Sequence, residues 1–159
     1  MKKENVQDFS APYIKRVSTV SESSVKVETP EIRMLVVNDN PIILSFLKVS
    51  FIKHFSVETA ENGFSALQRC QQVNFDIILM DINMSIMDGF KAAECIYTQS
   101  QVKPLIYAFT ADYDPATIRR VNESKHFHGH LAELNQDSIE HLRRVALKQK
   151  GHLKKRMRR

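Results

Sequence analysis

Strand-like apolar segments alternate five times with helix-like segments between residues 32 and 149 of the chain. Two of the strand segments, IRMLVVN (32–38) and FDIILMD (75–81), are almost continuously apolar, which is typical of strands buried on both faces of a sheet. Alternation of this kind favours a parallel sheet with helices on both faces. The sequence therefore predicts a doubly wound α/β domain, in which a five-stranded parallel sheet and five helices form three layers.

The elements can be placed from apolar runs and helix-start signals, such as Asn40 before Pro41 and Asp114 before Pro115. The five strands are expected at 32–38, 55–60, 75–81, 104–111 and, with the weakest pattern, 126–134. The five helices are expected at 41–54, 63–72, 87–99, 114–125 and 137–149.

Composition is that of a single globular domain. The chain has 159 residues, of which 43% are hydrophobic, and no apolar run approaches the roughly 20 residues that a membrane-spanning helix needs. The amino terminus has lysines but no apolar run behind them, which argues against a secretory signal. Cys70 and Cys95 form neither a disulfide framework nor a zinc motif, so we expect a reduced, cytoplasmic protein.

The two ends differ from the domain between them. Residues 1–31 lack a sustained period, and we interpret them as a flexible amino-terminal arm before a domain at 32–147. Residues 148–159 hold seven Lys or Arg and no acid, which leaves 16 basic against 18 acidic residues elsewhere. Such a basic tail could bind nucleic acid or an acidic membrane surface, or could simply increase solubility.

Polar residues stand where the predicted strands end. Asn38 and Asp39 follow the first strand, Asp81 ends the third and Thr110 lies at the end of the fourth. Open parallel sheets bind ligands beyond the carboxyl ends of their strands. Asp and Thr also end strands or cap helices for structural reasons, so one such position would mean little. Several at adjacent strand ends favour a ligand site.

The motifs VVNDNP, LMDINMSIMDG and FTA, at these separations on a fivefold strand–helix pattern, resemble the receiver domain of two-component response regulators. The resemblance covers residues 32 to 148 and implies a flavodoxin-like fold. It also implies a single-domain regulator in a phosphorelay, which signals through protein contacts. Its only catalytic role would be to assist its own phosphoryl transfer.

What the resemblance implies for the site is specific. A histidine kinase or histidine phosphotransfer protein would donate a phosphoryl group to Asp81. Magnesium would be held by the carboxylates of Asp39 and Asp81 and by the backbone carbonyl of Asn83. Thr110 would contact the phosphoryl group and act as the switch residue.

Three positions depart from the family pattern. Asn38 stands where a second acid is usual, which predicts weaker magnesium binding because an amide carries no net charge. Glu133 lies at or near the usual lysine position and would oppose a phosphoryl group if it faced the site, or would turn to solvent. His130 occupies the position of the usual aromatic switch residue. These departures keep a second hypothesis open, in which the chain is a pseudo-receiver that binds partners without phosphorylation.

Two further features have more than one interpretation. His126, His128 and His130 would share one face of a strand, where they could bind a metal or sense pH, or could be ordinary edge residues. The helix at 41–54 is apolar on all sides, which favours a homodimer or kinase-docking surface over cover by the amino-terminal arm. The fourth and fifth helices are the alternative partner surface.

Overall fold

A computed structural model describes residues 32–110 and 114–157, and side chains as far as residue 155. Its single sheet is parallel, with the strand order β2-β1-β3-β4-β5, so the predicted five-stranded doubly wound fold is confirmed. The strands are β1 (Arg33–Val37), β2 (Ser56–Ala60), β3 (Ile77–Met80), β4 (Leu105–Ala108) and β5 (Gly129–His130).

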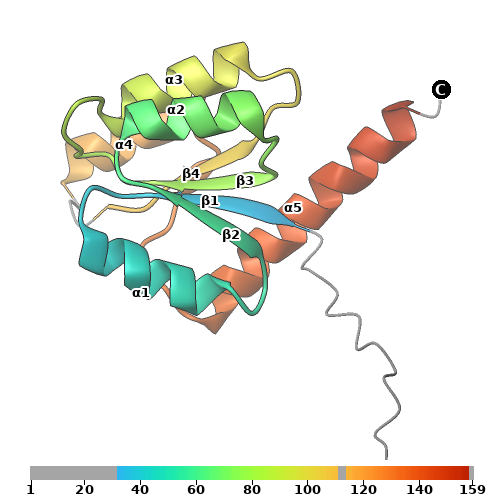
Figure 1. Cartoon of the computed structure of the whole chain (residues 1–159), viewed down its shortest axis with the longest axis horizontal. Coiled ribbons are helices and arrows are strands. Elements are labelled where there is room, and N and C mark those ends of the chain that lie inside the picture. The colour runs from blue at the N-terminus through green and yellow to red at the C-terminus, as the bar shows by residue number, and fades with distance from the viewer. Residues whose placement is uncertain (1–31, 111–113, 158–159) are drawn as a thin grey trace, which may run out of the picture.

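Five helices cover the two faces of this sheet. They are α1 (Pro41–Phe51), α2 (Gly63–Gln72), α3 (Gly89–Gln99), α4 (Pro115–Glu123) and α5 (Gln136–Met157). Figure 1 shows α1 and α5 on one face and α2, α3 and α4 on the other. Asn40 and Asp114 cap α1 and α4 as the sequence predicts, with their side chains accepting from backbone N–H groups of the first turn.

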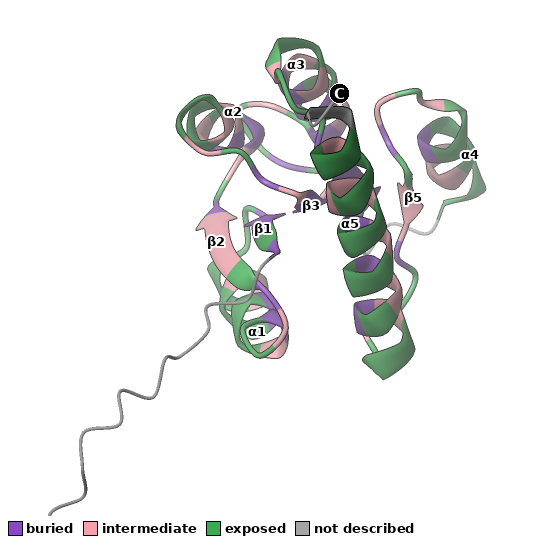
Figure 2. Ribbon diagram, turned by 90° about the vertical axis from the view of Figure 1, so that its right-hand side faces the viewer, coloured by how far each residue is buried: buried purple, intermediate pink, exposed green. Residues whose placement is uncertain are grey.

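Alternation along the strands divides the buried side chains between two cores. Met34 and Val36 of β1 belong to the core beneath α1 and α5, whereas Leu35 and Val37 belong to the core beneath α2, α3 and α4. All four are at most 1% exposed. From Met34 to Val37 this strand is continuously apolar because both faces of the sheet are covered. Figure 2 shows the helices on the two sides of the sheet.

The register of the strands aligns their carboxyl ends. Val37 pairs with Met80, Met80 with Ala108 and Ala108 with His130, so these residues form one row across the sheet. Asn38 and Asp81 come directly after that row. The sheet thus places the two side chains at the same level of one edge.

The fifth strand is shorter than the predicted 126–134. The His128 ring accepts a hydrogen bond from the backbone N–H of Ile106 through Nδ1, at 3.2 Å, where a strand would offer a carbonyl. Gly129 follows with a φ of 150°, a conformation that glycine adopts easily. The expectation that His126, His128 and His130 share one face of a strand is therefore wrong, because only His130 lies in β5 together with Gly129.

The fifth helix is longer than the predicted 137–149. It continues to Met157, so most of the segment expected as a basic tail is helical. Two contacts tie this part of the helix to the domain: Gln149 Nε2 donates to the Lys103 carbonyl at 2.6 Å, and Lys150 Nζ lies 3.0 Å from Asp76 Oδ2. The helix end then projects past the sheet (Figure 1). The predicted arm at 1–31 lies outside the described residues.

Other sequence expectations concern the cysteines and membrane helices. Cys70 and Cys95 are both free thiols, and burial raises the pKa of Cys70 to about 12, as fits a small core residue. In the described part of the chain, none of the helices has the length and apolar content to span a bilayer.

Gly89 supports the strand end at Asp81 by close backbone contact. Its N–H donates to the Ile82 carbonyl at 2.9 Å. A Cβ atom at this position would collide with the backbone carbonyl of Asp81. Gly151, in the extension of α5, has open space around the equivalent position.

These two glycines should respond to alanine in opposite directions. Gly89→Ala should lower the free energy of unfolding by about 1–3 kcal/mol, because backbone atoms must move to admit the methyl group. Gly151→Ala should raise it by up to about 1 kcal/mol, because alanine favours the helix. Urea denaturation measures both. A neutral Gly89→Ala variant would contradict the close packing, and a destabilising Gly151→Ala variant would contradict the helical extension.

Candidate functional site

Asp81 is the centre of the polar cluster at the carboxyl edge of the sheet. It follows the last residue of β3 and is half-buried. Its Oδ1 accepts from the backbone N–H of Ile82 at 2.7 Å, and its Oδ2 accepts from Nδ2 of Asn38 at 3.0 Å. The backbone N–H of Asn83 and the Thr110 side chain also hydrogen-bond to this carboxylate. Four donors from three segments therefore converge on one acid.

The pKa of Asp81 is nevertheless raised above its ordinary value. Partial burial is the largest cause, because it removes water from the charged form, and the negative charge of Asp39 adds to it. The hydrogen bonds from Ile82, Asn83 and Thr110 act in the opposite direction. Since a raised carboxyl pKa favours the protonated form in the fold, the charge of Asp81 costs stability at neutral pH and not at low pH.

Asn38 is fixed by two hydrogen bonds. It is 4% exposed, and its Oδ1 accepts from the backbone N–H of Asn40 at 2.9 Å while its Nδ2 donates to Asp81. The backbone bond determines which way round the amide lies. A carboxylate in this place could accept the first bond but could not donate the second. The amide thus gives Asp81 a neutral donor where a second acid would repel it.

Asp39 lies at the open side of the cluster. It is exposed, and its Oδ2 accepts from the backbone N–H of Ser85 at 3.1 Å. This bond joins the β1–α1 loop to the β3–α3 loop. Asn83, also exposed, lies within the second loop. The two carboxylates and the loop bearing the predicted carbonyl ligand are therefore neighbours.

Thr110 comes from the strand on the other side of Asp81. It lies two residues past the end of β4 and is 6% exposed. The structure thus brings together Asn38, Asp39, Asp81 and Thr110, which the sequence placed at adjacent strand ends. Their chemical roles remain predictions.

Glu133 lies apart from this cluster. It is exposed in the loop after β5, and its Oε2 is paired with Nδ2 of Asn135 at 3.4 Å. Of the two orientations that the sequence left open, the structure has the one that faces solvent. This side chain therefore makes no contact with Asp81 of the kind that a lysine would make, and it does not directly repel the Asp81 carboxylate.

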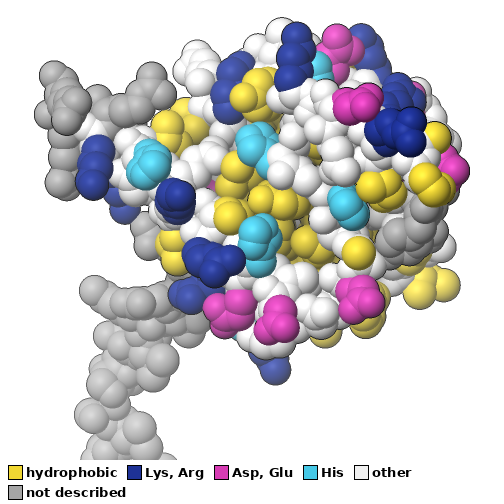
Figure 3. All heavy atoms as spheres, turned by 180° about the vertical axis from the view of Figure 1, so that it is seen from behind, with side chains coloured by type: hydrophobic (Ala, Val, Ile, Leu, Met, Phe, Trp, Pro, Cys, Tyr) yellow, Lys and Arg dark blue, Asp and Glu magenta, His cyan; other side chains and the backbone are white. Residues whose placement is uncertain are grey.

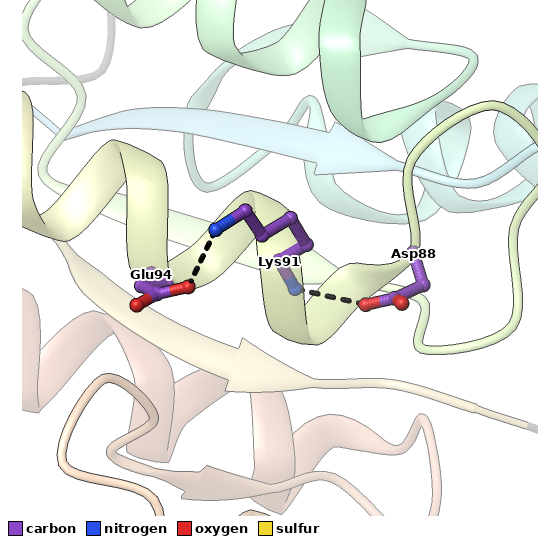
Figure 4. Close-up of polar contacts among 3 residues, drawn as sticks. All are labelled: Asp88, Lys91 and Glu94. Atoms are coloured by element: carbon purple, nitrogen blue, oxygen red, sulfur yellow. Dashed lines mark hydrogen bonds and ion pairs between the residues drawn. The ribbon is translucent and has the colours of Figure 1, made fainter.

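The loop between β3 and α3 contains features that sequence reasoning passed over. Ile86 is 83% exposed and has a φ of 69°, an unusual value for a β-branched residue. Asp88 caps α3 by accepting from the backbone N–H of Lys91 at 2.8 Å, and Lys91 Nζ pairs with Glu94 at 3.0 Å (Figure 4). The MDG motif was the signal in the sequence for this loop, since its Asp88 caps α3 and its Gly89 packs against the Asp81 backbone.

The histidines near β5 are dispersed. His126 and His128 pack near the Tyr97 ring, with centroid separations of 5.7 and 6.2 Å, and His130 is half-buried beside Ala108. Within residues 32–110 and 114–157, no three His, Cys, Asp or Glu side chains are grouped as metal ligands. The magnesium set expected at Asp81 needs only two carboxylates and a carbonyl, because Mg²⁺ retains several waters.

Comparison with known proteins agrees with this geometry. The family described as "Response regulator receiver domain" matches residues 34–132. The chain is 39% identical over 67 residues to the signal transduction histidine-protein kinase BarA of Escherichia coli, covering 40% of this chain and 7% of that protein. It is 32% identical over 110 residues to a protein-glutamate methylesterase/protein-glutamine glutaminase of Pseudomonas syringae, covering 67% of this chain and 32% of the relative. The match thus spans less than a third of either relative.

Solved structures match over most of their length. The chemotaxis protein CheY4 of Vibrio cholerae superposes with a TM-score of 0.63 at 28% identity, covering 72% of this chain and 98% of that one. The response regulator TrrA of Thermotoga maritima, solved in complex with Mg²⁺ and BeF, gives 0.60 at 26% identity, covering 74% and 98%. With its family match, fold and strand-end acids in agreement, the chain belongs to the response regulator receiver domain family.

Proposed function

We propose that this receiver accepts a phosphoryl group on Asp81 from a phosphohistidine, with Mg²⁺ at Asp39, Asp81 and the Asn83 carbonyl. The observation that best supports this is the half-buried Asp81 carboxylate with a raised pKa and a neighbouring carboxylate. A divalent cation would offset both the free-energy cost of burying the Asp81 charge and its repulsion by Asp39. Receiver domains are signalling domains, and the enzymatic relatives carry further length that this chain does not match.

The proposed reaction transfers a phosphoryl group from a donor, the phosphohistidine, to an acceptor, the Asp81 carboxylate. One carboxylate oxygen of Asp81 would attack the phosphorus of the phosphohistidine, the P–N bond would break, and the imidazole would leave with its electron pair. The product is an acyl phosphate. Magnesium would supply charge compensation for the crowded oxygens.

The residues around Asp81 have separate parts in this proposal. Asn38 Nδ2, which now donates to Asp81, would donate to the phosphoryl group. Thr110 would hydrogen-bond another phosphoryl oxygen. Because position 133 holds a glutamate and not a lysine, no cation from that position would pair with the phosphoryl group, and the phosphorylated state would depend more heavily on Mg²⁺. The absence of a lysine at position 133 also supports the alternative, a pseudo-receiver that binds partners without phosphorylation.

Phosphorylation can be tested by intact-mass spectrometry after incubation with Mg²⁺ and acetyl phosphate. We expect one phosphoryl adduct on the wild-type chain and none on Asp81→Ala, because the acceptor oxygen is gone. Asp137→Asn, at an exposed acid in the first turn of α5, is the matched control and should still be labelled.

A small donor can react too slowly even with a competent site, so the experiment has a second arm. Mg²⁺ with beryllofluoride should raise the melting temperature of the wild type and not of Asp81→Ala, since binding to the native state stabilises it. No adduct together with no thermal shift would overturn the proposal and favour the pseudo-receiver.

We further propose that α1 is the docking surface for the phosphodonor. Ile42, Phe46 and Val49 are 78, 60 and 71% exposed, and their spacing places them on one stripe of the helix. The Asp39–Ser85 bond holds the loop containing Ile86 beside the start of this helix. An exposed apolar stripe next to the acceptor suits a helical partner. Because the free cysteines also suit a reducing compartment, we place this transfer in the cytoplasm.

Phe46→Glu should slow phosphoryl transfer from a histidine kinase or phosphotransfer protein that labels the wild type by about tenfold or more, since it puts a charge in an apolar contact. Labelling by acetyl phosphate should be unchanged. Val102→Glu, at a 38% exposed residue on the opposite edge of the sheet, is the control. Equal rates for Phe46→Glu and wild type would exclude this docking surface. Loss of a dimer in Phe46→Glu would assign the stripe to self-association instead.

A further inference from the structure

A groove of about 780 Å³ lies at the opposite edge of the sheet from Asp81. It is formed by the end of α3, the loop leading into β4, the residue before β5 and the part of α5 from Val145 to Leu153. Its lining residues are Tyr97, Gln101, Val102, Lys103, His128, Val145, Lys148, Gln149, His152 and Leu153. This volume is in the range of about 300–1,000 Å³ found for small-molecule pockets.

The second half of α5 builds one wall of the groove. Lys148, Gln149, His152 and Leu153 all come from this part of the helix. The wall is held in place by the bond from Gln149 to the Lys103 carbonyl and by the ion pair of Lys150 with Asp76, whose side chains are only 23 and 18% exposed. The groove is therefore shaped in the absence of a ligand, which reduces the entropy that binding must overcome.

The lining combines apolar, aromatic and basic groups. Val102, Val145 and Leu153 supply apolar surface, and the Tyr97, His128 and His152 rings supply flat faces. Lys103 and Lys148 are the basic groups, and none of the ten lining residues is acidic. Figure 3 shows an apolar area bordered by histidines on this side of the molecule, with Lys and Arg along the projecting helix.

Lys103 is held in a defined position. Its Nζ donates to the carbonyls of Tyr97, Thr98 and Ser100, which uses all three of its donors, and it lies 5.2 Å from the centre of the Tyr97 ring. Lys148 on the opposite wall is exposed. A planar ligand between the walls would have an aromatic ring against its flat face and a lysine near its edge.

We propose that this groove binds a nucleoside monophosphate, with the base against the His152 ring and the neighbouring apolar side chains and the phosphate at Lys148. A planar base uses the aromatic and apolar lining, since stacking on aromatic side chains is a general mode of base recognition. A phosphate would pair with Lys148, while Lys103 adds positive charge nearby, and a lining without acids does not repel it. The site is separate from Asp81 and does not depend on phosphorylation.

The test is a titration of the full chain with AMP, GMP, CMP and UMP, followed by amide chemical shifts and by calorimetry. At least one should bind with a dissociation constant below about 1 mM. Adenosine and inorganic phosphate, as the two halves of AMP, should each bind about tenfold more weakly than the intact nucleotide, because neither uses both kinds of lining.

Variants connect the binding to the groove. Lys148→Gln and His152→Ala change exposed residues and should each weaken binding about fivefold or more. Lys53→Gln removes an exposed lysine that follows α1 and does not line the groove, and it should leave binding unchanged. Asp81→Asn should also retain binding, which separates this site from the phosphoryl site.

Three results would overturn the proposal. The first is no shift or heat with any of the four mononucleotides. The second is an equal loss of affinity in Lys148→Gln and Lys53→Gln, which would indicate only general attraction to a basic protein. The third is binding of a single-stranded decanucleotide but of no mononucleotide, which would make this surface a nucleic-acid contact and not a small-molecule site.

Discussion

The hydrogen bond from Asn38 to Asp81 is the interaction on which the site depends. It joins the ends of two central strands and gives a half-buried carboxylate a neutral donor at 3.0 Å. The same carboxylate has a raised pKa, because its partial burial outweighs the hydrogen bonds from Ile82, Asn83 and Thr110. A second acid in place of Asn38 would repel Asp81 until a cation arrived. The amide makes the apo site less dependent on that cation.

The central part of the fold could be predicted because its determinants are local. Continuous apolar runs identified β1 and β3, and Asn or Asp before Pro identified the starts of α1 and α4. The ends of the domain could not be predicted in the same way. At the β5 edge a histidine ring takes the place of a backbone partner, and the far part of α5 is joined to the domain by an ion pair between Lys150 and Asp76, 74 positions apart.

The site shows the same division. That Asn38, Asp81 and Thr110 lie together could be predicted, because parallel strands bring their carboxyl ends to one edge. The orientation of Glu133 depends on a weak side-chain contact with Asn135. The positive φ of Ile86 depends on the path of the loop between β3 and α3. Neither leaves a pattern in the sequence. The groove beside α5 could not be predicted, because the sequence shows residues 148–159 only as a basic tail of open role and does not show that they continue the helix.

The measurement that tests the role of Asn38 most directly is a magnesium titration of the wild type and Asn38→Asp at pH 7, with stability measured at zero magnesium. The account predicts that Asn38→Asp is less stable without Mg²⁺, because it replaces a donor with a charge beside Asp81, and binds Mg²⁺ about tenfold more tightly. Asn74→Asp, at an exposed loop residue, should change neither property. Equal magnesium affinity in the wild type and Asn38→Asp, or an apo variant as stable as the wild type, would contradict the account.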